Sequence, residues 1–326
     1  MSPRYPEIEP SRSDIFDVGD GHHLYWEECG NPSGKPAIVL HGGPGSGCTP
    51  WHRRLFDPDA YRVVLFDQRG CGRSIPHAGR DVAALTANTT DHQLADIEAL
   101  RTLLEIDRWL VWGGSWGCAL ALAYAERHPE RVSEMVLWGI TNGTREEEDW
   151  VFRGGVGAFF PDQWQRLLDG LPERDHGDAV AGYRRLLLDP DPAVHQAAAG
   201  EWCLWESATP DWPPRAGLAQ RFHDPVFALA FARLVTHYVH HHQWLEDGQL
   251  LRDIGRLDGI PAALVQGRFD MQGPLRSAWR LQRAWPGAAE LVVVDDAGHS
   301  PANRGVEDAL LAATDRFRGS MADSQA

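Results

Sequence analysis

Apolar residues along the first 140 positions follow two alternating spacings. Short apolar runs, typical of strands buried on both faces, alternate with segments in which apolar residues recur every three or four positions. The apolar runs are "PAIVL" (36–40), "YRVVLF" (61–66), "WLVW" (109–112) and "VSEMVLWGI" (132–140). The helical segments between them are 89–106 and 119–127. This alternation predicts a mostly parallel β-sheet with helices on both faces.

Two local signals refine this picture. Residues 15–34 alternate in polarity around Gly19-Asp20-Gly21, which predicts a β-hairpin ahead of the parallel strands. Thr90 or Asp91 is the expected cap of the helix within 89–106, since side-chain oxygens of these types bind free N–H groups at helix starts.

The strand spacing disappears after residue 142 and returns near residue 261 with "PAALVQGRFD" and "AELVVVDDAGHS". Between these points every patterned segment is helical. We therefore predict an α/β core formed by residues 1–142 and 253–326, with residues 143–252 inserted as a helical cap over the ligand-binding edge of the sheet. The charged run "REEED" (145–149) is interpreted as a solvated loop or helix start.

Composition narrows the classes of function. The chain has 326 residues, 43% of them hydrophobic, which is enough for one large core. Its formal net charge of −15 argues against nucleic-acid partners and anionic membranes, and no run of about 18 apolar residues could span a bilayer. The charge could favour a cationic substrate, although solubility alone also explains it.

Five cysteines at wide spacings, without a C-x-x-C pair, argue against a disulfide framework and against a zinc site. They favour a reducing cytoplasm, and the polar N-terminal segment has no secretory signal. The histidines at 22–23 and 240–242 have no carboxylate at metal-ligand spacing, and consecutive helical residues face different directions, so no metal is expected.

A nucleophile motif lies where a predicted strand meets a predicted helix. Residues 113–117 read "GGSWG", a G-x-S-x-G pattern in the strand–turn–helix context that it requires. Small neighbours let strand and helix approach, so the strained turn exposes the hydroxyl of Ser115 at the start of the helix. We predict that Ser115 is the nucleophile of an acyl-transfer enzyme.

A serine nucleophile needs a base, and the base needs an orienting carboxylate. In this architecture the order along the chain is Ser, then Asp or Glu, then His. Asp270 and His299 each follow a late predicted strand and fit this order. Asp295 and Asp296 are rivals for Asp270 but lie very close to His299 in sequence.

The tetrahedral intermediate also needs N–H donors. "HGGPG" (41–45) follows an early strand, and its Gly43, together with the residue after the nucleophile, Trp116, is predicted to form the oxyanion hole. Gly42 of the same motif is expected to contact the substrate.

Together, "LHGGPG", "FDQRGCGRS", "GGSWGCALALAYAERHPERV", "GRFDMQGP" and "DAGHS" resemble the α/β-hydrolase fold, and more narrowly the proline iminopeptidase family of serine aminopeptidases. The resemblance covers nearly the whole chain, including "FPDQWQ" and "EWCLWES" in the insert. It implies Ser115, Asp270 and His299 as nucleophile, orienter and base. It also implies a helical cap, a peptide or small-molecule substrate, and neither metal nor organic cofactor.

The insert departs from the family pattern at the residues that bind the free amino end of the substrate. Glu206 matches one family glutamate, but Val235 in "ARLVTHY" stands where a second is expected, and Trp138 where an arginine is expected. Loss of one partner of a buried charge pair typically costs about 2–5 kcal/mol, roughly thirty- to several-thousand-fold in kcat/KM. Glu201 and Glu246 are candidates to replace the missing acid.

Three functions remain open at this point. The first is a serine hydrolase that releases N-terminal proline, or a similar residue, from peptides through an acyl-enzyme. The second is a repurposed α/β-hydrolase that acts on a non-peptide ester, amide or lactone, for example in secondary metabolism. A binding protein without catalysis is disfavoured, because the Ser-Asp-His set and the oxyanion glycines are complete. The sequence leaves the oligomeric state open.

Overall fold

A single eight-stranded sheet organises the computed structural model, which describes residues 4–319. The strand order is β1-β2-β4-β3-β5-β6-β7-β8. The strands are β1 (Arg12–Asp17), β2 (His23–Gly30), β3 (Lys35–Leu40), β4 (Tyr61–Phe66), β5 (Trp109–Gly114), β6 (Val132–Trp138), β7 (Ala262–Gly267) and β8 (Ala289–Val294). β1 pairs antiparallel with β2, and β2 with β4, whereas the remaining pairs are parallel. The predicted hairpin and the mostly parallel sheet are therefore confirmed.

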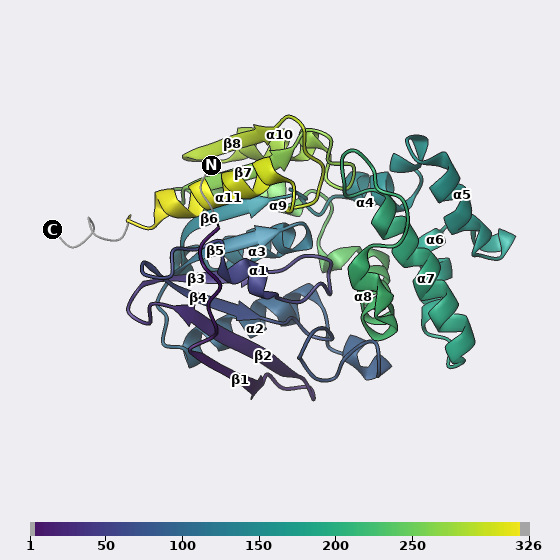
Figure 1. Ribbon diagram of the computed structural model, residues 1–326, viewed down its shortest axis with the longest axis horizontal. Helices are drawn as coiled ribbons and strands as arrows, with labels where there is room; N and C mark the ends of the chain where they lie inside the picture. Colours follow the sequence, from purple (N-terminus) through teal and green to yellow (C-terminus); the bar gives the residue numbers. More distant parts are fainter. Residues whose placement is uncertain (1–3, 320–326) are drawn as a thin grey trace.

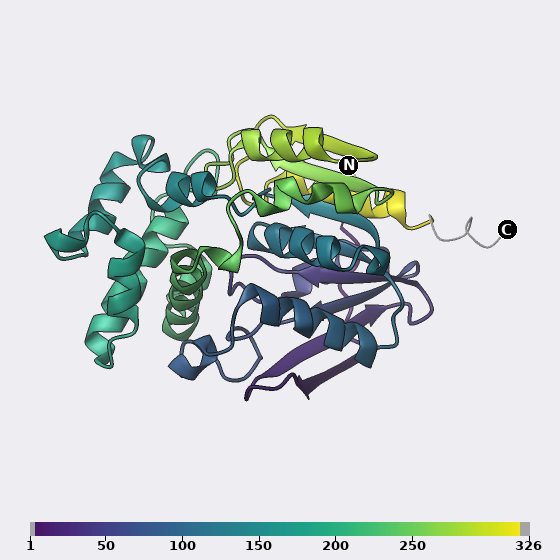
Figure 2. The same cartoon turned by 180° about the vertical axis from the view of Figure 1, so that it is seen from behind.

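Helices cover both faces of this sheet (Figures 1 and 2). Because side chains alternate along a strand, Ile38 and Leu40 of β3 pack with one set of helices, while Ala37 and Val39 pack with the other. The first set is α2 (Thr90–Leu103), α3 (Trp116–Arg127) and α10 (Leu275–Ala284). α11 (Arg304–Phe317) covers the opposite face, where the short α1 (Pro50–Arg53) also lies.

The predicted cap of the helix within 89–106 was wrong. The cap of α2 is Thr89, not Thr90 or Asp91: Thr89 is extended, and its hydroxyl accepts a hydrogen bond from His92 N at 3.4 Å. The first residues after it already have helical geometry, so the last extended residue takes the capping position.

The chain between β6 and β7 contains helices and no strand among the described residues. It includes α4 (Arg145–Phe152), α5 (Pro161–Asp169), α6 (Ala179–Leu187), α7 (Pro192–Ala208), α8 (Pro225–His240) and α9 (Gln249–Arg252). Helices α4 to α8 lie beside the edge of the sheet where the parallel strands end (Figure 1), and α5 to α8 bury a cluster of their own around Trp202 and Phe231. By contrast, α9 buries Leu250 in the hydrophobic cluster that α2, α3 and α10 form on one face of the sheet.

Candidate active site

Ser115 occupies a sharp turn between β5 and α3. Its backbone has φ 55° and ψ −125°, a combination that non-glycine residues rarely adopt, and it immediately precedes the first helical residue. A β-carbon on Gly117 would lie 2.0 Å from Leu40 O, and one on Gly113 would lie 2.3 Å from Gly117 O. Glycine is therefore required where strand and helix meet, and the elbow geometry expected from "GGSWG" is present.

His299 and Asp270 come together from two loops that follow β7 and β8. His299 Nδ1 donates a hydrogen bond to Asp270 Oδ2 at 2.8 Å. The same carboxylate accepts hydrogen bonds from Gln266 Nε2 at 2.8 Å and from the N–H groups of Gln272 and Gly273 at 2.9 and 2.7 Å. This bonding fixes the carboxylate behind the imidazole, the arrangement that orients a general base.

The two rival carboxylates lie elsewhere. Asp295 and Asp296 are exposed, and Asp295 pairs with Arg268 at 2.6 Å. Asp270, in contrast, is only 3% exposed. Among these acids, the structure places Asp270 against His299.

The predicted oxyanion-hole residues border the same cavity as Ser115 and His299. Gly43 and Trp116 both line it. Trp116 is the first residue of α3, where a helix N–H has no partner within the helix. A β-carbon on Gly42 would lie 3.0 Å from the Ser115 β-carbon, so the "HGGPG" loop passes directly over the nucleophile.

Gln68 connects the two sides of this oxyanion site. Its amide Nε2 donates to His41 O at 2.8 Å, and its Oε1 accepts from the Trp116 indole at 3.0 Å. Its backbone N–H donates to His41 Nε2 at 3.1 Å. Burial lowers the pKa of His41, so the neutral ring can accept this bond while its Nδ1 donates to Gly42 O.

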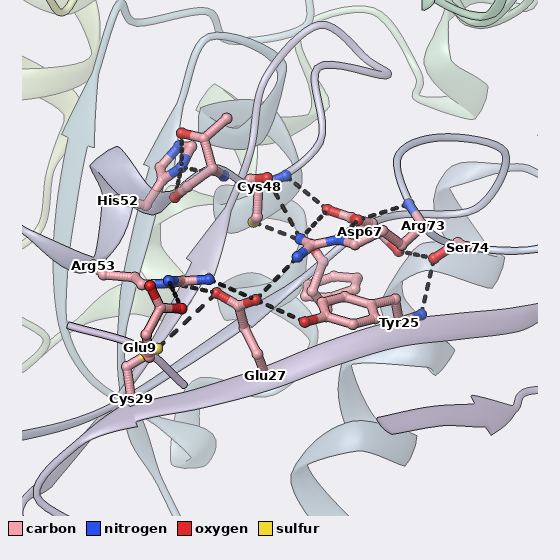
Figure 3. Close-up of polar contacts among 12 residues, drawn as sticks. Glu9, Tyr25, Glu27, Cys29, Cys48, His52, Arg53, Asp67, Arg73 and Ser74 are labelled. Atoms are coloured by element: carbon pink, nitrogen blue, oxygen red, sulfur yellow. Dashed lines mark hydrogen bonds and ion pairs between the residues drawn. The ribbon is translucent and has the colours of Figure 1, made fainter. Parts of the chain in front are cut away.

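A network of charged side chains holds the far end of the "HGGPG" loop (Figure 3), and in it Asp67, Glu27 and Arg53 are buried whereas Arg73 is exposed. Asp67 accepts hydrogen bonds from Cys48 N at 2.7 Å and from Arg73 Nε at 2.7 Å. Arg73 also reaches Glu27 at 3.0 Å, and Arg53 binds the other oxygen of Glu27 at 2.8 Å. The "DQRGCGRS" motif thus positions the loop from both ends.

Glu206 and Val235 face the cavity from the helical segment. Glu206 lies on α7 and Val235 on α8, and both line the cavity with Ser115. Burial raises the pKa of Glu206 to about 7, opposed by the charges of Arg221 and His299 and by polar contacts with Trp202 and Gln272. Glu206 Oε1 is buried and accepts no hydrogen bond from a described residue.

The two acids expected to compensate for Val235 do not reach the cavity. Glu201 pairs with Arg166 at 2.8 Å on the outer side of α7, and Glu246 pairs with Arg252 at 3.1 Å in solvent. Neither lines the site. Trp138, at the end of β6, packs its ring 5.9 Å from that of His299.

The interpretation of "REEED" as a solvated segment was wrong for two of its residues. Thr144 caps α4, and the 3.6-residue period turns Glu147 and Glu148 inward, where they are 8% and 6% exposed and line the cavity. The alternative that this run is a helix start was correct, since α4 begins at Arg145, and the T-x-x-E spacing of Thr144 and Glu147 is the capping-box signature of such a start.

Glu147 and Glu148 differ in their contacts. Glu147 accepts hydrogen bonds from the Thr141 hydroxyl, from the N–H and side-chain amide of Asn142, and from the N–H of Thr144. These bonds fix the segment that leads into α4. Glu148 accepts hydrogen bonds from His242 Nδ1 at 2.7 Å and Gln243 Nε2 at 3.0 Å. Burial raises the pKa of Glu148, opposed by these two partners.

Among residues 4–319, no three His, Cys, Asp or Glu side chains gather as metal ligands do. Within the same part of the chain, no helix has both the length and the apolar character needed to cross a membrane.

Comparison with known proteins agrees with this geometry. A family model described as alpha/beta hydrolase fold matches residues 35–302. The crystal structure of a proline iminopeptidase from Mycobacterium smegmatis superposes with a TM-score of 0.64 at 21% identity, covering 95% of this chain and 98% of that one, which supports the fold alone. The family match and the fold define the class as an α/β-hydrolase.

Sequence relatives narrow the class. A protein from Streptomyces coelicolor, named a probable proline iminopeptidase, is 50% identical over 98% of this chain and 99% of its own length. Proline iminopeptidases from Xylella fastidiosa and Arabidopsis thaliana are 47% and 44% identical over 97% of this chain, covering 100% and 82% of their own lengths. The chain belongs to the proline iminopeptidase family of α/β-hydrolases.

Proposed function

We propose that this chain is a serine aminopeptidase that releases an N-terminal proline, or a similar residue, from peptides through an acyl-enzyme. The observation that carries the proposal is the common cavity: Ser115, His299, Trp116 and Glu206 all border it. A nucleophile, a base, an oxyanion donor and an amine-binding acid are the four groups that aminopeptidase chemistry at a serine requires.

In the proposed reaction, Ser115 Oγ attacks the carbonyl carbon of the first residue while His299 takes the hydroxyl proton. The negative charge that develops on the carbonyl oxygen is stabilised by the N–H of Trp116 and by the loop that contains Gly42 and Gly43. His299 then protonates the leaving amine, which gives a prolyl ester of Ser115. Water, activated by the same imidazole, hydrolyses this ester and releases proline.

Asp270 orients His299 and stabilises the imidazolium form at both steps. Glu206 binds the free ammonium of the substrate, which restricts the enzyme to the first residue of a peptide. Its unpartnered Oε1 supports this role, since a buried acceptor without a donor is costly unless a ligand supplies one.

We also propose that residues 143–252 act as the cap that closes over this cavity, with the core formed by residues 1–142 and 253–326. A cytoplasmic location is proposed as well. It is supported by the five cysteines, all of which are free.

Substitution of Ser115 tests the proposal, with proline p-nitroanilide as the charged substrate and cyclopentanecarboxylic acid p-nitrophenyl ester as its neutral ring analogue. Ser115→Ala should lower kcat on either substrate by at least about a thousandfold while the melting temperature stays close to that of the wild type. A fluorophosphonate probe should label Ser115 in the folded wild type alone.

The ratio of the two substrates separates the proposed peptidase from the repurposed hydrolase. A clear preference of the wild type for the prolyl amide, once the intrinsic reactivity of the ester is taken into account, is the expected result. Turnover of the ester with none of the amide would contradict the peptidase assignment and favour the repurposed hydrolase.

A further inference from the structure

The cavity at Ser115 is lined by three carboxylates. Glu147, Glu148 and Glu206 border it, and its other charged or titratable lining residues are His299 and Tyr238. Among the described residues, no lysine or arginine lines it. A buried site of this composition favours a cation, because an ammonium lowers the electrostatic cost of holding several carboxylates together.

The three carboxylates are not equally available to a ligand. Four hydrogen bonds at the start of α4 occupy Glu147, which is therefore a structural group. Glu206 has an unpartnered oxygen. Glu148 accepts hydrogen bonds from His242 and Gln243, and its Oε2 lies 3.9 Å from Nη1 of Arg145.

The donors to Glu148 come from an unusual piece of backbone. His242, Gln243 and Trp244 all have positive φ, at 52°, 56° and 52°, so they form a left-handed turn without glycine. Such a conformation is strained for residues other than glycine, and strain of this kind concentrates at functional sites. Thr90 Oγ1 donates a hydrogen bond to Gln243 O and so anchors the turn to α2.

The effect of this turn is to fix the position of Glu148 at the cavity wall. Gln243 also lines the cavity, and its Nε2 donates to Glu148 Oε1. Its own Oε1 is buried and accepts no hydrogen bond from a described residue. The cavity that Val235 borders thus also carries an oriented carboxylate, which comes from α4 and not from α8.

We propose that Glu148, oriented by His242 and Gln243, is the second carboxylate that binds the substrate's ammonium group alongside Glu206. It takes the place of the acid that is missing at Val235. The inference rests on the proposed aminopeptidase function and names the residue that gives this site its preference for a charged amino end.

The test compares the prolyl amide with the neutral cyclopentane ester in Glu148→Gln. This variant keeps the size of the side chain and an acceptor for one donor, but it removes the charge. We expect kcat/KM for the prolyl amide to fall roughly 10- to 100-fold, mainly through KM, with less than a threefold change for the neutral ester. Glu201→Gln, which removes a surface carboxylate of α7, is the matched control. It should leave kcat/KM unchanged for both substrates.

A purely structural role for Glu148 would give a different result. If the substitution disrupted the turn at 242–244, kcat/KM would fall equally for both substrates and the melting temperature would fall as well. That outcome would overturn the proposal. An unchanged prolyl kcat/KM in folded Glu148→Gln would overturn it too. If the wild type does not cleave the prolyl amide at all, it is the aminopeptidase function itself that fails.

A second variant avoids dependence on the folding of Glu148→Gln. In Glu206→Gln, Glu148 is the remaining amine-binding carboxylate, so the variant should keep a measurable preference for the prolyl amide over the neutral ester. Complete loss of that preference in Glu206→Gln would mean that Glu148 contributes nothing to amine binding.

Discussion

The sheet side and the helical side of the cavity are constructed in different ways. On the sheet side, Ser115, Asp270 and His299 follow the ends of β5, β7 and β8, and each is fixed by backbone geometry or by a short hydrogen bond. On the helical side, Glu206 and Glu148 come from different helices, and the position of Glu148 depends on a turn almost a hundred residues further along. On the proposed function, the catalytic residues are therefore set by the ends of the strands, whereas the amine-binding acids are set by the packing of helices.

This difference implies that the helical side can change while the sheet side stays constant. A helix face can lose an acid at position 235 and gain one at position 148 without any change in the strand ends. Variants of the sheet side should therefore affect charged and neutral substrates alike, and variants of the helical side should affect the charged substrate alone.

The largest effect is expected from Asp270→Asn. An amide at this position presents the wrong hydrogen-bonding partner to His299 Nδ1 and cannot stabilise the imidazolium, so kcat should fall by about 10³–10⁴ on both substrates. Asp295→Asn, at the exposed rival position, is the control and should leave kcat unchanged. Steady-state kinetics of both variants provide the measurement. If Asp295→Asn were the impaired enzyme, Asp295 and not Asp270 would be the carboxylate that orients His299.

A smaller effect is expected from Gln68→Leu. Loss of the bonds to His41 O and the Trp116 indole should loosen both oxyanion donors and lower kcat roughly 10- to 100-fold, with KM changed less than threefold. The drop should be equal for the prolyl amide and the neutral ester, because the oxyanion is common to both. A loss confined to the prolyl amide would break the proposed separation between the two sides.

Thermal unfolding of Gln68→Leu provides the stability control. The buried indole N–H and carbonyl left without partners cost about 1–3 kcal/mol, so a modest fall in melting temperature is expected. Kinetics measured well below that temperature report the catalytic effect.

The smallest effect is a pH dependence of substrate preference, which arises from Glu206 on the helical side. Glu206 has a pKa of about 7 in the free enzyme, raised from 4.5 mainly by burial, so it is largely neutral below that pH and cannot attract an ammonium. The ratio of kcat/KM for the prolyl amide to that for the neutral ester should rise as pH increases through about 7, by up to about tenfold over two pH units. The ratio cancels the titration of the base, which both substrates share.

Glu206→Gln should flatten this ratio, which is the control for the assignment. The charged groups that act on Glu206 are Arg221 and His299. A ratio that keeps its full slope in Glu206→Gln would assign the titration to Glu148, whose pKa is also raised by burial.

Much of the sheet side could be predicted from sequence because its signals are local. The glycines around Ser115, the strand before it and the helix after it lie within about twenty residues, and strand ends locate Asp270 and His299. Glu148 could not be found in this way. It lies in a run of charges that is typical of solvent, and only the packing of α4 against the turn at 242–244 buries it.

Glu201 and Glu246 illustrate the converse error. Both are close in sequence to the expected amine-binding segments, but helix rotation places Glu201 on the outer surface of α7, and Glu246 lies in solvent in the segment before α9. Sequence proximity does not determine which side of a helix faces a cavity, so the compensating acid required the three-dimensional structure.

The loop that carries His299 is tied to the helical segment. The N–H groups of His299 and Ser300 both donate to Pro210 O, at 2.6 and 3.1 Å, and Trp212 stacks on Phe269 with ring centroids 4.5 Å apart. Lifting the chain at Pro210 would remove both bonds from the loop of the general base. If residues 143–252 are the cap and His299 is the base, as proposed, opening the cap at Pro210 would also disturb the base, and we expect peptides to be cleaved only while they are enclosed.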